Sequence, residues 1–315
     1  MPYRLRGEDA DLETAVRRIA FEQIDRAILE LDDPALDRHE AVHQIRKRCK
    51  KLRGLLRLVR GACPDYAAEN AAFREMARSI SGLRDTQALI EAYDALAIRA
   101  GEAVDRQAMG LIRRRLTLQQ KEAGADDAAL EAKLGELRKG LVSARKRAER
   151  WRVEQDGFAA IAPGLEKTYR RARLAMADAR RAGTPRQFHE WRKRVKYHWY
   201  HMRLLKELWP AEMAAREGEA DRLGELLGDD HDLAVFRQSL LDDPQAYGDL
   251  RTVQIFVELL DARRHELQAQ AQSLGARLLA EKPRRLVRRL DKYWTSWQAE
   301  RDKAAPSSDT TARAA

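Results

Sequence analysis

The chain has 315 residues, 44% of them hydrophobic and 35% charged, a length that allows one large core or two smaller ones. Its 60 basic and 50 acidic residues give a formal net charge of +10, which favours an acidic partner such as nucleic acid, a phosphate polymer or membrane headgroups. No stretch approaches the ~20 apolar residues of a membrane span, and the first 13 residues are charged where a secretory signal is apolar, so we expect neither a membrane protein nor a secreted one.

Good helix formers dominate the sequence, and Gly, Pro and Asp divide it into segments typical of long helices. No segment shows the steady alternation of a strand. In chain order the predicted helices cover residues 8–31, 38–60, 65–100, 103–123, 126–156, 158–182, 185–208, 210–241, 245–281 and 284–300. We therefore predict an all-α fold of long helices in antiparallel bundles, followed by a disordered tail over residues 304–315, which are small and polar.

An internal repeat indicates the architecture more closely. The segment HQIRKRCKKLRGLLRL, His43 to Leu58, aligns without a gap with HEWRKRVKYHWYHMRL, His189 to Leu204. Upstream, AVRR resembles TYRR, and downstream LRDTQAL resembles LGDDHDL. Three blocks in the same order predict one bundle built twice, as two pseudo-twofold-related antiparallel four-helix bundles over residues 1–157 and 158–303.

Each copy of the repeated segment has separate apolar and basic faces when it forms a helix. The basic face of the first copy consists of His43, Arg46, Lys47, Lys50, Arg53 and Arg57. That of the second consists of His189, Arg192, Lys193, Lys196, Tyr200 and Arg203. Between residues 43 and 60 there is no carboxylate, so an external anion is the favoured source of the missing negative charge. The alternative is that the cations are simply exposed, or that acids of neighbouring helices pair with them.

Signals for a metal site or for catalysis are weak. Residues 39–43 read HEAVH and fit the zinc pattern H-E-x-x-H, but the second copy lacks the histidine pair and no third ligand has a suitable spacing. The two cysteines, Cys49 and Cys63, have no metal-like or paired spacing, which fits a reduced, cytoplasmic setting. No phosphate-binding loop or nucleophile motif occurs. We therefore expect a binding module without cofactor or metal rather than an enzyme.

From about residue 8 to residue 300 the chain resembles the conserved histidine α-helical domain family, abbreviated CHAD. The blocks that carry the resemblance are VHQIRKRCKKLRGLLRL, LRDTQAL, YRRARLAMADA, FHEWRKRVKYHWYHMRLL, LGDDHDLAVF and KPRRLVRRLDKYWTSW. The resemblance implies two helical halves whose facing surfaces form a basic channel for inorganic polyphosphate, and association with polyphosphate granules. A triphosphate-tunnel catalytic domain, which accompanies some members, is not expected because no ExExK strand motif occurs.

Carried over residue by residue, the family pattern adds five positions to the two basic faces. They are Tyr169, Arg170, Arg173, His231 and, from the first half, Arg17. The pattern is incomplete in the first half, where Gln87 stands at the position of His231. His198 and His201 match Leu52 and Leu55, so a place in the core or at an interface is favoured for both.

Three other functions are compatible with the sequence. RNA or DNA would offer a similar phosphate backbone, although base stacking needs exposed aromatics, and only Tyr197 and Tyr200 are candidates. A metal-dependent phosphohydrolase and a helical scaffold for a protein partner are the others. Sulfate or phosphate ions are expected at the basic faces in crystals. The oligomeric state is not predicted.

Overall fold

The computed structural model describes residues 3–80, 85–100, 106–123 and 127–304, and these residues form helices and short connections without a strand. The helices are α1 (Leu12–Asp32), α2 (Arg38–Leu58), α3 (Tyr66–Ser79), α4 (Asp85–Ala100), α5 (Arg106–Ala123), α6 (Asp127–Ala148), α7 (Gly157–Ala182), α8 (Pro185–Leu204), α9 (Pro210–Asp242), α10 (Leu250–Leu278) and α11 (Pro283–Ala304), with single 3₁₀ turns η2 (Lys206–Leu208) and η3 (Pro244–Ala246). The all-α prediction is confirmed. The predicted tail lies outside the described residues, apart from Ala304 at the end of α11.

Local sequence signals define several helix ends. The side chain of Asp37 accepts hydrogen bonds from the backbone N–H groups of His39 and Glu40, at 2.9 and 3.1 Å, and so caps α2. At the start of α8 the cap residue is Thr184, but its side chain makes no capping hydrogen bond and Pro185 occupies the first turn. Helix α7 ends at Gly183, whose φ of 65° is in the left-handed region that glycine tolerates best.

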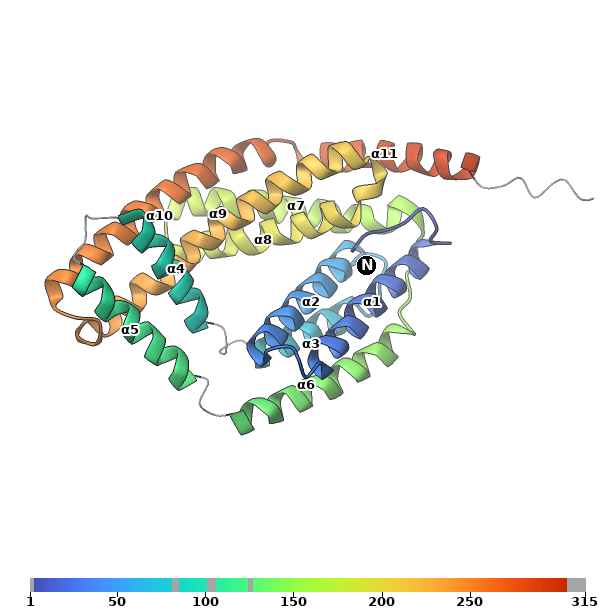
Figure 1. Cartoon of the computed structure of the whole chain (residues 1–315). Helices are drawn as coiled ribbons and strands as arrows, with labels where there is room; N and C mark the ends of the chain where they lie inside the picture. The colour runs from blue at the N-terminus through green and yellow to red at the C-terminus, as the bar shows by residue number, and fades with distance from the viewer. Residues whose placement is uncertain (1–2, 81–84, 101–105, 124–126, 305–315) are drawn as a thin grey trace, which may run out of the picture.

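Helices α1, α2, α3 and α6 form one group, and α7 to α10 form a second, with α11 packed along α7 (Figure 1). Helix α2 also packs against α7 and α8, so the two groups share one continuous core. Its largest buried side chains include Phe73 and Trp151 in the first group and Trp191 in the second. The boundary at residue 157 and the pseudo-twofold relation stay predictions.

A second, smaller core lies at the far end of the molecule, where α4 packs on α9 and α10 and α5 packs on α4 (Figure 1). Tyr93 of α4 stacks on Phe256 of α10, with 6.1 Å between ring centroids, and meets the ring of Phe236 of α9 edge-on at 6.2 Å. Two helices of the first half thus extend the helical layer of the second. The helix expected over residues 65–100 is divided between α3 and α4, which pack in different cores.

Two close backbone approaches bring the halves together at α2. Helices α2 and α8 cross where Gly54 meets Tyr200, and a Cβ atom at Gly54 would lie 2.9 Å from the Cβ of Tyr200. A Cβ atom at Gly164 of α7 would lie only 1.8 Å from the carbonyl oxygen of Leu58. Glycine is therefore required at both positions because no side chain fits between the helices. Gly54 and Tyr200 are also equivalent positions of the aligned repeat.

Candidate anion-binding site

The basic face of α2 lies along α3. Arg46 donates from Nη1 to the backbone oxygen of Ala77 at 3.2 Å, and Arg53 donates from Nε to Oδ1 of Asn70 at 3.4 Å. Arg57 also donates to Oδ1 of Asn70. These acceptors are neutral, so they orient the guanidinium groups without cancelling their charge. Of the other members of this face, His43 is half-buried, whereas Lys47 and Lys50 are exposed.

The basic face of α8 lies along α9, and here carboxylates are present. Lys196 pairs with Asp221 at 2.9 Å, and Arg203 pairs with Glu217 at 3.3 Å. Lys193 pairs with Glu190 of its own helix. The expectation that an external anion balances both faces is therefore wrong for these three members of the α8 copy. Helix α9 supplies the carboxylates for Lys196 and Arg203, and α8 itself supplies the one for Lys193.

Glycines let α8 approach α9 closely enough for long cations to fit between them. The guanidinium of Arg192 lies 3.1 Å from the position that a Cβ atom would take at Gly228, and the Lys196 side chain lies 3.0 Å from that position at Gly224. Arg192 Nε is buried without a hydrogen-bond partner among the described residues.

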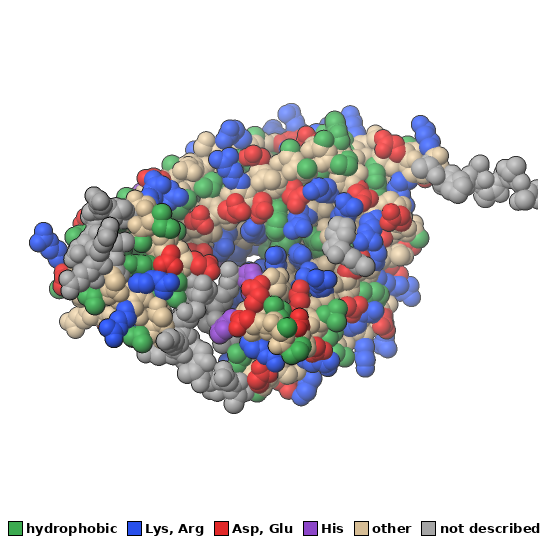
Figure 2. Space-filling model, viewed as in Figure 1, with side chains coloured by type: hydrophobic (Ala, Val, Ile, Leu, Met, Phe, Trp, Pro, Cys, Tyr) green, Lys and Arg blue, Asp and Glu red, His purple; other side chains and the backbone are tan. Residues whose placement is uncertain are grey.

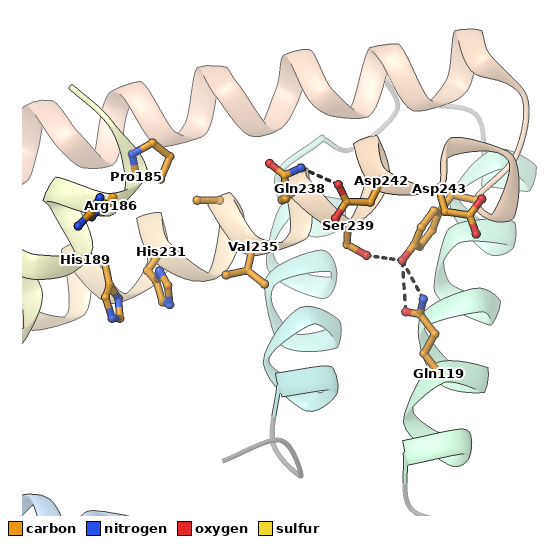
Figure 3. Close-up of a pocket in the computed structure, with 12 residues that line it drawn as sticks. Gln119, Pro185, Arg186, His189, His231, Val235, Gln238, Ser239, Asp242 and Asp243 are labelled. Carbon is orange, nitrogen blue, oxygen red and sulfur yellow. Dashed lines mark hydrogen bonds between the residues drawn. The ribbon is translucent and has the colours of Figure 1, made fainter. Parts of the chain in front are cut away.

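His189 and His231 are brought together as a ring pair at the end of this face. Their ring centroids are 4.0 Å apart, and a cavity of about 620 Å³ opens beside them, lined also by Pro185, Gln119 and Tyr247 (Figure 3). Burial lowers the pKa of His189 to about 4, assisted by His231 and nearby cations. The ring is therefore neutral near pH 7, and an anion bound beside it would favour the protonated form.

Several predicted contacts lie elsewhere. Tyr169 is fully buried, meets the ring of His198 edge-on with 5.2 Å between the ring centroids, and donates a hydrogen bond to the backbone oxygen of Leu278. Tyr200 is buried at the crossing with α2. The burial of both rings does not support the prediction that these two tyrosines contact the ligand.

The arginines predicted outside the two faces are dispersed. Arg17 pairs with Glu13 at 2.6 Å and donates to the backbone oxygen of Trp151, so its charge is already used at the junction of α1 and the α6–α7 connection. Arg173 donates to the backbone oxygen of Glu281, beyond the end of α10. Arg170 is exposed on α7. None of the three has a hydrogen bond or ion pair, among the described residues, to either basic face.

The structure brings three cations that the sequence analysis did not select, Arg60, Arg171 and Arg194, close to Arg57. Arg57 lies over the ring of Tyr197, 4.0 Å from its centroid, and Arg60 donates to Thr168 Oγ1 of α7 at 2.8 Å. Arg171 of α7 and Arg194 of α8 lie close enough to affect the pKa of Arg60. Arg171 and Arg194 both belong to blocks of the internal repeat, so the sequence contained a signal for them. Their proximity to the end of α2 is evident only from the fold.

The face drawn in Figure 2 shows acidic and basic side chains mixed over most of the surface. It also shows a narrow opening between the two groups of helices, with Lys, Arg and His side chains at its rim. Among the described residues no cluster of three or more His, Cys, Asp or Glu side chains is placed to hold a metal ion. The helices of the same residues include none that is long and apolar enough to cross a membrane.

Fold and site together define an all-helical protein whose two related helices, α2 and α8, present basic side chains where its halves meet. The chain belongs to the CHAD domain family, whose profile matches residues 18–241. Its fold is similar to that of PptA from Streptomyces chartreusis, with a TM-score of 0.57 and 16% sequence identity over 84% of this chain and 96% of the other. A comparison with curated proteins finds no match.

Proposed function

We propose that this protein binds inorganic polyphosphate, without catalysis, along the basic face of α2 and the adjoining part of α8. The observation that carries the proposal is that Arg53 and Arg57 are held by hydrogen bonds to an uncharged group. Both donate to the side-chain amide oxygen of Asn70, and neither has an ion pair among the described residues. Fixed, uncompensated guanidinium groups suit an anion with closely spaced oxygens, because each fork donates two charge-assisted hydrogen bonds. Membership of the CHAD family supports the same ligand.

The aromatic side chains near these cations favour polyphosphate over nucleic acid. The ring of Tyr197 is covered by Arg57, and that of Trp199 lies within 4.3 Å of the Lys196 ammonium and 4.9 Å of the Arg203 guanidinium. Trp199 is also only 8% exposed. Stacking of a base needs an open ring face, and these faces are occupied. Competition of labelled polyphosphate with tRNA at matched phosphate concentration should therefore favour polyphosphate.

The direct test is a thermal-shift series with long-chain polyphosphate. A ligand that binds only the folded state raises the melting temperature. Binding through phosphate contacts weakens as the salt concentration rises, because releasing the counterions of the polymer then gains less free energy. We expect stabilisation at 50 mM salt that is largely lost at a few hundred mM. By analogy with single-stranded nucleic acids, the logarithm of the association constant should fall by roughly 0.7 per phosphate contact for each tenfold rise in salt. Absence of any shift at low salt would contradict the proposal.

A charge-matched pair of variants assigns the binding to α2. Lys50→Gln with Arg53→Gln removes two charges from the basic face, whereas Lys133→Gln with Lys146→Gln removes two exposed charges from α6. Only the first variant should lose affinity and, in cells, association with polyphosphate granules. Orthophosphate release should stay at background with added divalent metal, and release that His43→Ala abolishes would indicate a phosphohydrolase instead.

A further inference from the structure

The α2–α8 crossing has cations on two sides, and the sides differ in how many carboxylates pair with them. On one side, Lys51 lies one helical turn before Gly54 and Arg203 lies one turn after Tyr200. We call this the paired side, and it consists of Arg4, Lys51, Arg203 and Lys206. Carboxylates pair with three of these four cations: Glu217 binds both Arg203 and Lys206, at 3.3 and 3.0 Å, and Glu207 binds Arg4 at 2.9 Å. An external anion would compete with these acids.

The other side, which we call the arginine edge, consists of Arg53, Arg57, Arg60, Arg171 and Arg194. Arg53 and Arg57 belong to α2, Arg60 lies just beyond its end, and Arg171 and Arg194 belong to α7 and α8. Among the described residues, Glu190 is the one carboxylate ion-paired with them; it lies 3.3 Å from Arg194 and is shared with Lys193. The five guanidinium groups therefore share one ion-paired carboxylate, and the exposed Glu75 interacts with Arg53 without an ion pair.

Burial makes this imbalance unfavourable in the unliganded protein. Arg57 is 8% exposed and its contacts are neutral: the amide of Asn70, the backbone oxygen of Arg53 and the ring of Tyr197. Burial, together with the positive charges of Arg57, Arg171 and Arg194, lowers the pKa of Arg60 to about 10 despite the Tyr66 ring beside it. Like charges held in a partly dry site are stabilised when an anion enters.

Neutral groups hold the arginine edge in shape. Thr168 Oγ1 accepts from Arg60 Nη2 at 2.8 Å, and the backbone oxygen of Arg57 accepts from Arg60 Nε at 2.8 Å. Below them, the buried His201 donates from Nε2 to the Gly54 oxygen and stays neutral, because burial and the charge of Arg60 hold its pKa far below the usual range. The guanidinium groups are thus positioned before any ligand arrives, which lowers the entropy lost on binding.

We propose that the arginine edge is an anion subsite for a compact oligophosphate group of about three phosphates, and that a polyphosphate chain passes between the halves on this side only. The proposal rests on the proposed function for the identity of the long polymer. Three of its residues, Arg60, Arg171 and Arg194, lie outside the set that the repeat and the family pattern predict. Since the cations belong to helices of both halves, an occupied subsite joins α2 to α7 and α8.

Inorganic tripolyphosphate is the probe that tests the subsite, measured by calorimetry at low salt. Arg60→Gln with Arg194→Gln should lower its affinity at least about tenfold, the loss expected for two charge-assisted hydrogen bonds. Arg4→Gln with Lys206→Gln removes two charges from the paired side and should change affinity less than about twofold, as for exposed pairs. Equal losses in the two variants, or no binding of tripolyphosphate to the natural protein, would overturn the proposal.

A second pair on one helix avoids any effect of burial on folding. Arg171 and Arg180 are both exposed on α7, so Arg171→Gln should weaken tripolyphosphate binding and Arg180→Gln should not. Long-chain polyphosphate is titrated in parallel. If it binds the natural protein but Arg171→Gln and Arg180→Gln behave alike, the subsite is wrong and the proposed function stands. If it does not bind the natural protein at all, the proposed function itself fails.

Discussion

At the scale of single residues, two buried histidines of α8 link protonation to folding. His198 is 1% exposed and His201 is fully buried. Burial, with the charge of Arg216, lowers the pKa of His198 to about 3, and burial holds the pKa of His201 well below its ordinary value. Both rings are neutral in the folded protein but titrate near pH 6.5 in the unfolded chain. Their contribution to stability is therefore complete above pH 6.5 and is lost as the pH falls below it.

Acid should accordingly destabilise the protein through these two side chains. Below pH 6.5 each histidine removes about 1.4 kcal/mol of unfolding free energy per pH unit, down to its folded-state pKa. His198→Phe keeps an aromatic ring beside Tyr169 and should flatten the pH dependence between pH 6.5 and 5 by about that amount. Urea unfolding at several pH values measures it, and identical slopes for both proteins would contradict the assignment.

Asn70 offers a residue-scale test of why the α2 face needs an anion. Asn70→Asp places a carboxylate where Arg53 and Arg57 both donate. We expect a gain of about 1–2 kcal/mol in stability from charge-assisted hydrogen bonds and a severalfold loss of polyphosphate affinity. Gln155→Glu, at an exposed position, is the charge-matched control. Unchanged affinity in Asn70→Asp would show that these arginines do not hold the ligand.

The burial of a single residue could be predicted from the sequence only where the apolar pattern of its own helix determined it. The apolar positions matching Leu52 and Leu55 correctly indicated a buried place for His198 and His201. The burial of Tyr169 and Tyr200 was not predictable, because a tyrosine suits both a ligand surface and a core and the basic residues around them gave no sign of burial. The grouping of Arg60 with Arg171 and Arg194 depends on contacts between three helices, which periodicity within one helix does not reveal.

At the scale of helices, the positions of the basic faces depend on close packing at Gly164 and Gly54. Gly164→Ala would push a methyl group into the backbone of α2 at Leu58, where no side chain can give way. We expect a loss of at least about 1–3 kcal/mol, typical of overpacking, read from urea unfolding. Gly218→Ala in α9, with open space around it, should instead be neutral or stabilise by up to about 1 kcal/mol. Similar effects of both substitutions would contradict the packing.

Helix number and ends were largely predictable, since Asp37, Pro185 and Gly183 mark ends by their own chemistry. The neutralisation of cations on the second basic face, that of α8, was not predictable. Asp221 and Glu217 neutralise Lys196 and Arg203 from a different helix, so their partners could be known only once α8 was seen to pack on α9.

At the scale of the whole molecule, the chain has two cores that should respond separately to damage. Phe236 belongs to the smaller core with α4 and α10, whereas Phe73 belongs to the larger one. Phe236→Ala should lower stability by about 3–5 kcal/mol and speed hydrogen exchange in α4, α9 and α10, leaving α1 and α2 protected. Phe73→Ala should do the reverse. Faster exchange everywhere in both variants would show a single cooperative unit.

The repeat predicted a duplicated helical architecture but not the path of α4 and α5. Sequence similarity between the halves suggests that each closes its own bundle, yet Tyr93 and its neighbours bury their apolar surface on α9 and α10. An apolar helix face indicates that the helix packs against another element, but the sequence pattern does not identify that element.

The central claim, that polyphosphate binds where α2 meets α8, is tested most directly by a crystal structure of the protein with long-chain polyphosphate. We predict a continuous row of phosphates along the basic face of α2, in contact with Arg53 and Arg57 and passing over the arginine edge. Phosphates bound only at other surfaces, with these guanidinium groups facing solvent, would contradict it.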